Sequence, residues 1–298
     1  MNDDAYKEDR KMFHESWFNE NTVDFWRHKR MYETIKPLAL FFKDKKWLSV
    51  GDGRYGLDSY RLNKMFGLDI FPTDISENML KESKKRGVIK DYSVENAERL
   101  SFQNNSFDIV FCKESFHHFP RPIMAVYEMI RVACIAVILI EPKERYTMCP
   151  AGVFFRQLIK MFINSLLANM DLFNRGYTFF NEHPHVFEQS GNYVYALSTR
   201  EFGKIVHGLN LEGFAWKGLN DCYIKGCEFE LAEENNSVFK TIKDRIRKAD
   251  VKCNRFPIFH DWGLITAVIF KKEIAQDLKK AMEFEGYYFP NTVKNPHI

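Results

Sequence analysis

Two kinds of hydrophobic pattern alternate along most of the chain. Short apolar runs, typical of strands buried on both sides, lie at 47–50, 68–73, 107–111, 135–140, 211–216 and 263–270. Longer segments with apolar residues at helical spacing lie at 57–66, 78–85, 123–132, 199–207 and 237–249. Alternating strands and helices are typical of a doubly wound α/β fold. The pattern therefore predicts a mainly parallel sheet of seven strands with helices on both faces.

Local signals mark several of the helix ends. Gly67 follows the helix at 57–66, and glycine is the usual residue just past a helix C-terminus. Ser76 precedes the next helix as an N-cap. Ser198 and Glu201 have the spacing of a capping box, so a helix is expected to begin there.

The first part of the chain, residues 5–43, carries aromatic and apolar side chains at helical spacing. It predicts two helices with a break near Pro37, placed beside or over the strand ends. Packing into a core explains the aromatic stripe. A second interpretation is a lid in which Trp17, Trp26 or Arg30 helps to enclose a ligand.

Five segments follow from these elements: an N-terminal helical lid at 1–44, a core at 45–142, an insertion at 143–197, the remainder of the sheet at 198–272, and a C-terminal helix and tail at 273–298. The insertion is longer than an ordinary connection, and a helix is expected within it at 153–170. We expect the insertion to shape a substrate pocket. The last segment is charged and is expected to form a solvated edge.

Composition limits the classes of partner. Lys and Arg number 43 against 40 Asp and Glu, so the net charge of +3 does not suggest a nucleic-acid surface. Six cysteines form no Cys-x-x-Cys pair, which is typical of reduced thiols in the cytoplasm. The longest apolar run, 132–140, is too short to span a membrane. The composition predicts a cytoplasmic protein, and its partners must be inferred from its sites.

A turn rich in glycine follows the first predicted strand. Gly51, Gly53 and Gly56 would let the backbone approach a ligand closely at the start of a helix. Asp74 lies 23 positions after Gly51, close to the spacing expected of an acid that accepts ribose hydroxyls. Both features suit an adenosine-containing cofactor, either a dinucleotide such as NAD or another nucleoside.

Three later segments narrow the choice of cofactor: Asn96-Ala97-Glu98-x-Leu-x-Phe, then Phe107-Asp-x-Val, then His117-His118-Phe. With the glycine turn they resemble, in order and spacing, the class I S-adenosylmethionine-dependent methyltransferases of the type 11 methyltransferase-domain group. The resemblance covers about residues 45–142. It implies a Rossmann-like fold, S-adenosyl-L-methionine as the cofactor and methyl transfer as the activity.

The resemblance also implies a set of cofactor-binding residues. Carried over by position, these are Gly51, Asp52, Gly53, Gly56, Asp74, Ile75, Asn96 and Ala97, and Lys113 is a further candidate for a cofactor contact. Two positions depart from the family pattern. Ser49 stands where the family commonly has an acid, and Tyr55 stands where it has its third glycine. The methionine amino group therefore needs another partner, for which Asp52 is a candidate.

Catalytic groups are expected after the fourth strand, because loops at the carboxyl ends of parallel strands carry ligands. His117 or His118 would act as a general base on an acceptor hydroxyl, and at most one is expected to reach it. A purely structural role is the alternative for each. Glu141 ends the next strand and is a candidate acceptor-site residue. His183 and His185 lack nearby cysteines or paired acids, so no metal site is predicted.

We expect methyl transfer to a small polar acceptor. The glycine turn and the segment from Cys112 to Pro122 resemble bacterial methyltransferases associated with surface-polysaccharide synthesis, which favours a sugar hydroxyl or polysaccharide precursor. Two alternatives stay open at this stage. One is a non-catalytic module that binds S-adenosylmethionine, and the other is an NAD-dependent oxidoreductase.

Overall fold

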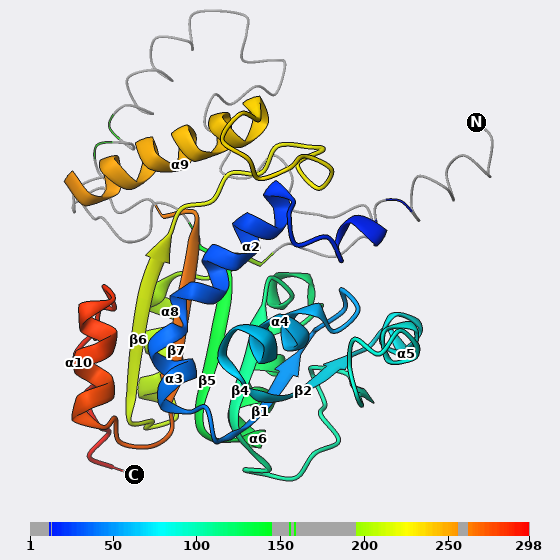
Figure 1. The fold of residues 1–298 in the computed structure, drawn as a ribbon. Coiled ribbons are helices and arrows are strands. Elements are labelled where there is room, and N and C mark those ends of the chain that lie inside the picture. The colour runs from blue at the N-terminus through cyan, green and yellow to red at the C-terminus, as the bar shows by residue number, and fades with distance from the viewer. Residues whose placement is uncertain are drawn as a thin grey trace, which may run out of the picture.

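The computed structural model describes residues 14–144, 195–255 and 262–297, together with the single positions 12, 155 and 158. A seven-stranded sheet with the order β3-β2-β1-β4-β5-β7-β6 forms the centre of the molecule (Figure 1). Its strands are β1 (Lys46–Val50), β2 (Asp69–Asp74), β3 (Ser93–Val94), β4 (Phe107–Lys113), β5 (Ala133–Pro142), β6 (Gly213–Leu219) and β7 (Leu264–Phe270).

Strands β3, β2, β1, β4 and β5 run parallel, and β7 pairs antiparallel with both β5 and β6. The doubly wound, mainly parallel sheet is therefore confirmed. The chain winds outward from β1 to β2 on one side and continues through β4 on the other. Such a point of reversal leaves a crevice beyond the carboxyl ends of the strands, where ligands bind in this class of fold.

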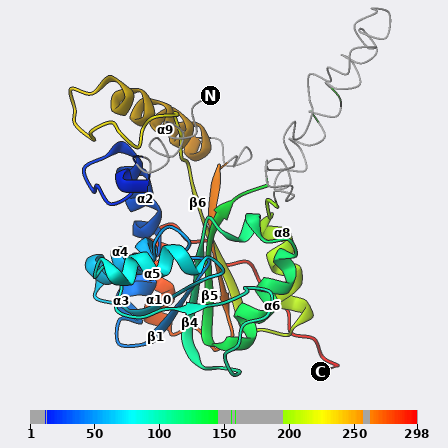
Figure 2. The same ribbon diagram turned by 90° about the vertical axis from the view of Figure 1, so that its right-hand side faces the viewer.

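Helices cover both faces of the sheet, as the hydrophobic pattern predicted (Figure 2). They are α2 (Val23–Thr34), α3 (Lys36–Phe41), α4 (Leu57–Phe66), α5 (Glu77–Lys85), α6 (Pro122–Val132), α8 (Thr199–Gly208), α9 (Ser237–Arg255) and α10 (Gln276–Phe284). Pro37 lies in the first turn of α3, which accounts for the break between the two N-terminal helices.

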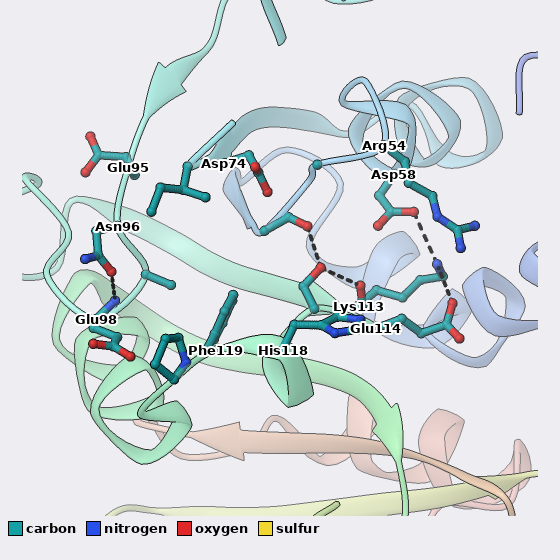
Figure 3. A pocket seen from close by; sticks show the side chains of 16 residues that line it. Arg54, Asp58, Asp74, Glu95, Asn96, Glu98, Lys113, Glu114, His118 and Phe119 are labelled. Atoms are coloured by element: carbon teal, nitrogen blue, oxygen red, sulfur yellow. Dashed lines mark hydrogen bonds and ion pairs between the residues drawn. The ribbon is translucent and has the colours of Figure 1, made fainter. Parts of the chain in front are cut away.

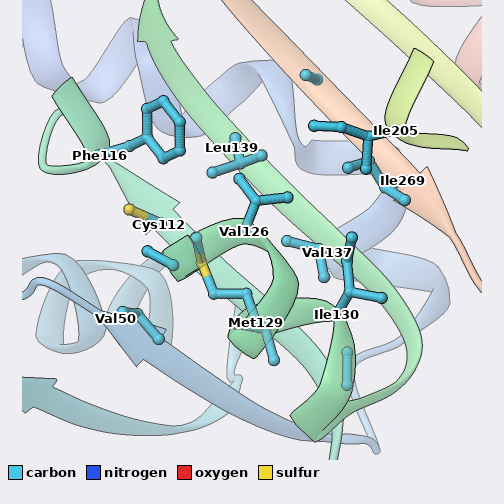
Figure 4. Packing of buried hydrophobic residues seen from close by; sticks show 14 of the residues in the cluster. Val50, Cys112, Phe116, Val126, Met129, Ile130, Val137, Leu139, Ile205 and Ile269 are labelled. Carbon is cyan, nitrogen blue, oxygen red and sulfur yellow. The ribbon is translucent and has the colours of Figure 1, made fainter. Parts of the chain in front are cut away.

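Each face of the sheet has its own apolar core. On one face, Val126 and Met129 of α6 pack with Val137 and Leu139 of β5 (Figure 4). On the other face, α3, α4 and α10 contribute to a second cluster around Trp47. Because both faces are covered, every residue of β7 is buried. This explains why the central strands appear as continuous apolar runs in the sequence.

The helix-end signals had mixed outcomes. Gly67 is left-handed at φ +73°, and Ser198 and Glu201 form the predicted capping box. Ser76 occupies the N-cap position of α5 without a side-chain capping bond. The strand predicted at 211–216 begins at Gly213, because Leu211 belongs to the turn that closes α8 and its N–H donates to Val206.

The structure adds detail to two expectations about the later helices. The C-terminal helix has mostly exposed residues, as expected of an edge, but Leu278 and Met282 of α10 are buried in the core that includes α3. The helix predicted at 237–249 extends to Arg255 and contributes to a separate cluster with Val23 and Cys227 instead of to either sheet core.

We call residues 220–255, with the first turn of α2, the cap lobe. Figure 1 shows α9 beyond the end of the sheet toward which the β6 arrow points, which is the carboxyl end of the parallel strands. Phe239, Ile242 and Ile246 of α9 form its apolar side. Arg27 joins α2 to this lobe through two hydrogen bonds to Asp221. The cap lobe therefore lies at the edge where a ligand crevice is expected.

Candidate active site

The glycine turn after β1 is packed so closely that side chains do not fit. Gly51 has φ +78°, and a Cβ there would lie 2.6 Å from Cβ of Ser115. A Cβ on Gly53 would lie 2.9 Å from Oδ2 of Asp74. Backbone N–H groups of Gly51 and Asp52 donate to the carbonyl of Thr73, which fixes the turn to the end of β2. The turn thus presents bare backbone at the carboxyl edge.

A cavity of about 510 Å³ opens beside this turn (Figure 3). It is lined by Gly51, Gly53, Arg54, Asp58, Asp74, Ile75, Glu95, Asn96, Ala97, Glu98, Lys113, Glu114, Ser115, His118, Phe119 and Pro120. Seven of the nine sequence-predicted cofactor residues are in this wall, and they come from four separate parts of the core. The sheet topology has therefore assembled them around one space.

Asp52 and Gly56, the other two, lie outside the lining. The buried carboxylate of Asp52 accepts hydrogen bonds from the N–H groups of Asp58 and Ser59 and from the Ser59 hydroxyl, so it caps the start of α4. Burial and the charge of Asp58 raise the pKa of Asp52 to about 7, against the effect of these hydrogen bonds. Gly56 is left-handed and packs against Ile89. Both residues shape the turn, and their direct contact with a cofactor stays a prediction.

One end of the cavity suits a nucleoside. Oδ1 of Asp74 accepts the Ser76 N–H at 2.7 Å, and burial raises the pKa of the Asp74 carboxyl. Ile75 exposes 71% of its surface at the rim. Oδ1 of Asn96 accepts the N–H of Glu98 at 2.9 Å, which turns the loop there. An acid, an apolar side chain and an amide thus lie together, as contacts to ribose and a purine ring require.

The other end of the cavity is charged. Lys113 Nζ lies 3.4 Å from Asp58 Oδ1 and 3.2 Å from Glu114 Oε2, and it also lies over the ring of Tyr32. Burial lowers the pKa of Lys113, but Asp58, Tyr32 and Glu114 outweigh that effect and raise it above its ordinary value. Lys113 therefore stays charged at neutral pH. Glu114 has φ +48°, an unfavourable conformation for a residue other than glycine.

His28 of α2 is buried against this charged end. Its Nδ1 lies 3.2 Å from Glu114 Oε2, and its Nε2 lies 2.8 Å from Arg54 and 3.5 Å from Asp24. Burial lowers the pKa of His28, and Lys113 and Arg54 lower it further, while Glu114 and Asp24 act in the opposite direction. The net result is a neutral imidazole in the folded protein.

We expect this neutral His28 to make the protein less stable in mild acid. Below about pH 6.5 the unfolded chain binds a proton that the folded protein does not, so the free energy of unfolding falls with pH by up to about 1.4 kcal/mol per unit from this residue. Urea unfolding at several pH values between 5 and 8, compared with His28→Gln, measures this contribution. Parallel curves for the two proteins would show that the pKa of His28 is the same in the folded and unfolded states, which would contradict the prediction.

A carboxylate holds the loop after β4. Glu141 is 1% exposed, and its Oε1 accepts the N–H groups of Ser115 and Phe116, each at 3.0 Å. Its Oε2 lies 2.7 Å from Nδ1 of His117. The rings of His117 and His118 are 3.9 Å apart, and His118 is the one that lines the cavity. Glu141 thus orients His117 next to the cavity wall.

The three proposed lid residues lie outside the cavity lining. Trp17 packs under the guanidinium of Arg54, 5.2 Å from it. Trp26 packs edge-on against Phe239 of α9, and Arg30 donates to the carbonyl of Asn220. Trp26 and Arg30 therefore join α2 to the cap lobe, as packing residues, and Trp17 supports a residue that lines the cavity.

Several lining residues were missed in the sequence: Arg54, Asp58, Glu95, Glu98, Ser115, Phe119 and Pro120. Arg54 and Asp58 stand in or just after the glycine turn, so their position was an available signal. His28 gave no signal, because α2 and β4 are far apart in sequence. His183 and His185 lie outside the described residues.

Among the described residues, Asp24, Cys227 and Glu228 form a buried group of potential metal ligands. The guanidinium of Arg27 already lies there, 3.0 Å from Asp24 Oδ1 and 3.9 Å from Cys227 Sγ. The protein therefore supplies its own cation at this position. In the part of the chain that the structure covers, no helix is both long and apolar enough to cross a membrane.

Comparison with known proteins identifies the core. Residues 48–139 match the family model described as a methyltransferase domain. This stretch contains β2, β3, β4 and most of β1 and β5, and with them every lining residue of the cavity. The chain therefore contains a class I S-adenosylmethionine-dependent methyltransferase domain. No curated protein matched the chain.

Solved structures with detectable similarity include a protein of Pyrococcus horikoshii OT3, at 25% identity over 42% of this chain and 63% of that one, with a TM-score of 0.34. An S-adenosylmethionine-dependent methyltransferase of Thermotoga maritima is 16% identical over 82% of this chain and 95% of that one, with a TM-score of 0.42. A Methanosarcina mazei methyltransferase is 14% identical over 78% and 94%, also at 0.42.

Proposed function

We propose that this S-adenosylmethionine-dependent methyltransferase methylates a hydroxyl group on a small polar acceptor, such as a sugar or a polysaccharide precursor. The observation that carries the proposal is the pair formed by Glu141 and His117, a buried carboxylate bound to an imidazole beside the cofactor cavity. A hydroxyl is a weak nucleophile that benefits from a base, whereas a thiolate or a neutral amine needs less help.

The cavity fits the cofactor on several grounds. Gly51 and Gly53 leave backbone space that a Cβ would fill, Asp74 offers a carboxylate to ribose, and Ile75 offers an apolar surface to adenine. Asn96 and Ala97 would lie at the adenine edge. When bound, S-adenosylmethionine supplies a methyl group on a sulfonium, which is already a good leaving group. The protein must align the acceptor with that methyl, a contribution that can reach roughly 7–11 kcal/mol.

His117 is the first candidate for the base. With Nδ1 donating to Glu141, the neutral ring accepts a proton at Nε2, and the carboxylate stabilises the imidazolium that results. Such assistance typically contributes about 10²–10⁴-fold in rate. His118 lines the cavity and is the second candidate. Adjacent side chains point in different directions, so we propose that one of the two reaches the acceptor.

The choice of acceptor rests on the resemblance of the glycine turn and the segment from Cys112 to Pro122 to polysaccharide-associated enzymes. The low net charge of +3 disfavours a nucleic-acid substrate. We also propose a cytoplasmic location, on the basis of the cysteine pattern. We further propose that the five segments defined from the sequence are the functional divisions of the chain. The insertion at 143–197, most of which lies outside the described residues, would then form part of the acceptor site.

Two measurements test the function. Calorimetric titration with S-adenosylhomocysteine and with NAD distinguishes the two cofactors considered from the sequence, and we expect binding of the first alone. Transfer of a labelled methyl group to a panel of sugars and to cell-extract fractions tests catalysis. Binding without transfer to any acceptor would favour a non-catalytic module over our proposal.

Asp74→Ala should weaken S-adenosylhomocysteine binding by roughly 1–3 kcal/mol, because the ribose hydroxyls would lose their acceptor in a partly buried place. Calorimetry with the purified variant measures the change. Asp69→Ala, at the exposed start of the same strand, is the matched control and should leave affinity unchanged. Equal affinity of the Asp74 variant and the wild type would remove Asp74 from the site.

A further inference from the structure

The two ends of the cavity differ in chemistry. Figure 3 shows Glu95, Asn96 and Glu98 together on one side, and Arg54 and Asp58 with Lys113 and Glu114 on the other. The charged side combines residues from the glycine turn, the first turn of α4 and the end of β4. These are the elements closest to the bare backbone at Gly51. A ligand that lies along the turn would therefore place one end among these charges.

Two carboxylates at this end retain an unused oxygen. Lys113 contacts Oδ1 of Asp58 and Oε2 of Glu114, and Tyr32 also donates to Oδ1 of Asp58. Among the described residues, neither Asp58 Oδ2 nor Glu114 Oε1 has a hydrogen-bond partner. Both side chains are mostly buried, with 13% and 25% exposed. Both residues line the cavity, so these two oxygens are available to a ligand that donates hydrogen bonds.

The charges at this end of the cavity have both signs. Asp58, Glu114 and Lys113 together carry a net charge of −1, and the adjacent Arg54 adds +1, so the four side chains together suit a zwitterionic ligand. Arg54 lies next to them with 48% of its side chain exposed. Its Nη1 is held by His28 at 2.8 Å, and the guanidinium stacks on the ring of Trp17. A fixed guanidinium beside the carboxylates offers donors to a ligand carboxylate.

The residue at position 49 explains why a ligand ammonium would need carboxylates from outside strand β1. Ser49 is buried in β1, its carbonyl accepts the hydroxyl of Thr73, and its own short side chain carries no charge. Strand β1 therefore supplies no carboxylate behind the glycine turn. The nearest carboxylate within the turn, Asp52, is engaged with the start of α4. An ammonium bound here must find its acceptors on α4 or β4.

We propose that Asp58, Glu114 and Arg54 form the subsite for the α-amino acid end of the cofactor. Asp58 and Glu114 accept hydrogen bonds from the ammonium, and Arg54 donates to the carboxylate. Lys113 holds the two carboxylates at a fixed separation, and His28 holds Arg54. The inference rests on the proposed function. It adds the residues that would let the site prefer a nucleoside with an amino acid group over the same nucleoside without that group.

Two ligands distinguish recognition of the amino acid end from a structural disturbance of the whole cavity. S-adenosylhomocysteine carries the amino acid end, and 5′-methylthioadenosine has the same nucleoside and thioether without it. By calorimetry, we expect the wild type to bind S-adenosylhomocysteine at least about tenfold more tightly. Glu114→Gln and Arg54→Gln should each lower that affinity at least about tenfold and change the affinity for 5′-methylthioadenosine by less than about twofold.

Glu98→Gln is the matched control, because Glu98 also lines the cavity but lies at its opposite end, paired with Arg121. It should change the two affinities by the same factor. Circular dichroism confirms that each variant is folded. Equal wild-type affinity for the two ligands, or equal losses for both in the Glu114 and Arg54 variants, would overturn the subsite and leave the proposed function intact. If neither ligand binds the wild type, the proposed function fails together with the subsite.

Discussion

Gly51→Ala is expected to lower the affinity for S-adenosylhomocysteine at least about a hundredfold, or ~2.8 kcal/mol. The new Cβ would lie 2.6 Å from Cβ of Ser115 and 3.2 Å from the ring of Phe119, so the loop after β4 must move. That loop begins at Glu114 and carries Glu114 and His118 into the cavity wall. The left-handed backbone at φ +78° adds strain for any side chain, roughly 1–2 kcal/mol. Calorimetry and urea unfolding measure the two effects separately.

Gly67→Ala is the control for this experiment. Gly67 is also left-handed, at φ +73°, but nothing lies within 4 Å of a Cβ placed there. We expect a loss of about 1–2 kcal/mol in stability from the backbone strain and no change in ligand affinity. If both glycine variants bind S-adenosylhomocysteine like the wild type, the close packing of the turn against Ser115 is not needed for the site.

Glu141→Gln is expected to lower turnover about 10–100-fold at neutral pH while S-adenosylhomocysteine affinity stays within about twofold, since an amide cannot stabilise an imidazolium as a carboxylate does. The glutamine oxygen still accepts the N–H groups of Ser115 and Phe116. Glu141→Ala removes this acceptor as well and leaves buried donors unpaired, so it should also cost roughly 3–5 kcal/mol of stability. Labelled-methyl transfer and urea unfolding measure these outcomes.

Two comparisons show whether Glu141 acts through a histidine. His117→Ala should lower turnover at least as much as Glu141→Gln does, and the double variant should be no slower than His117→Ala alone. His118→Ala tests the alternative base in the same assay. Additive losses from Glu141→Gln and His117→Ala would show that the two residues act independently and would exclude the proposed pairing.

Much of the fold follows from the sequence because its strands are buried on both faces. A short, continuous apolar run such as 135–140 is most readily explained as a strand that is buried on both faces. Glycines such as Gly67 mark helix ends because they can adopt the left-handed backbone conformation required there. The buried side of the C-terminal helix was not predicted because only Leu278 and Met282 face the core, a narrow stripe among charged residues. The sequence predicts the helix at 237–249 but not its packing partner, because apolar spacing does not reveal which partner covers it.

The site was predictable to the extent that backbone and topology determine it. The glycine turn and Asp74 are recognisable because spacing along one βαβ unit fixes where they meet. The charged end was not predictable in the same way. His28 reaches Glu114 across 86 positions of sequence, and the carboxylate of Glu141 reaches His117 from the next strand. Such contacts depend on the tertiary arrangement, for which a single sequence carries no periodic signal.

The cap lobe affects the order in which the protein can fold. Arg27 and Asp221 are separated by 194 positions, and Val23 shares a core with Ile246 of α9. These contacts close a very long loop, which is slow because its entropy is lost before any contact is gained. During synthesis the sheet strands from β1 to β5 emerge while α2 still lacks this partner. The cap lobe is therefore expected to assemble late, and α2 keeps an apolar surface exposed until α9 has been made.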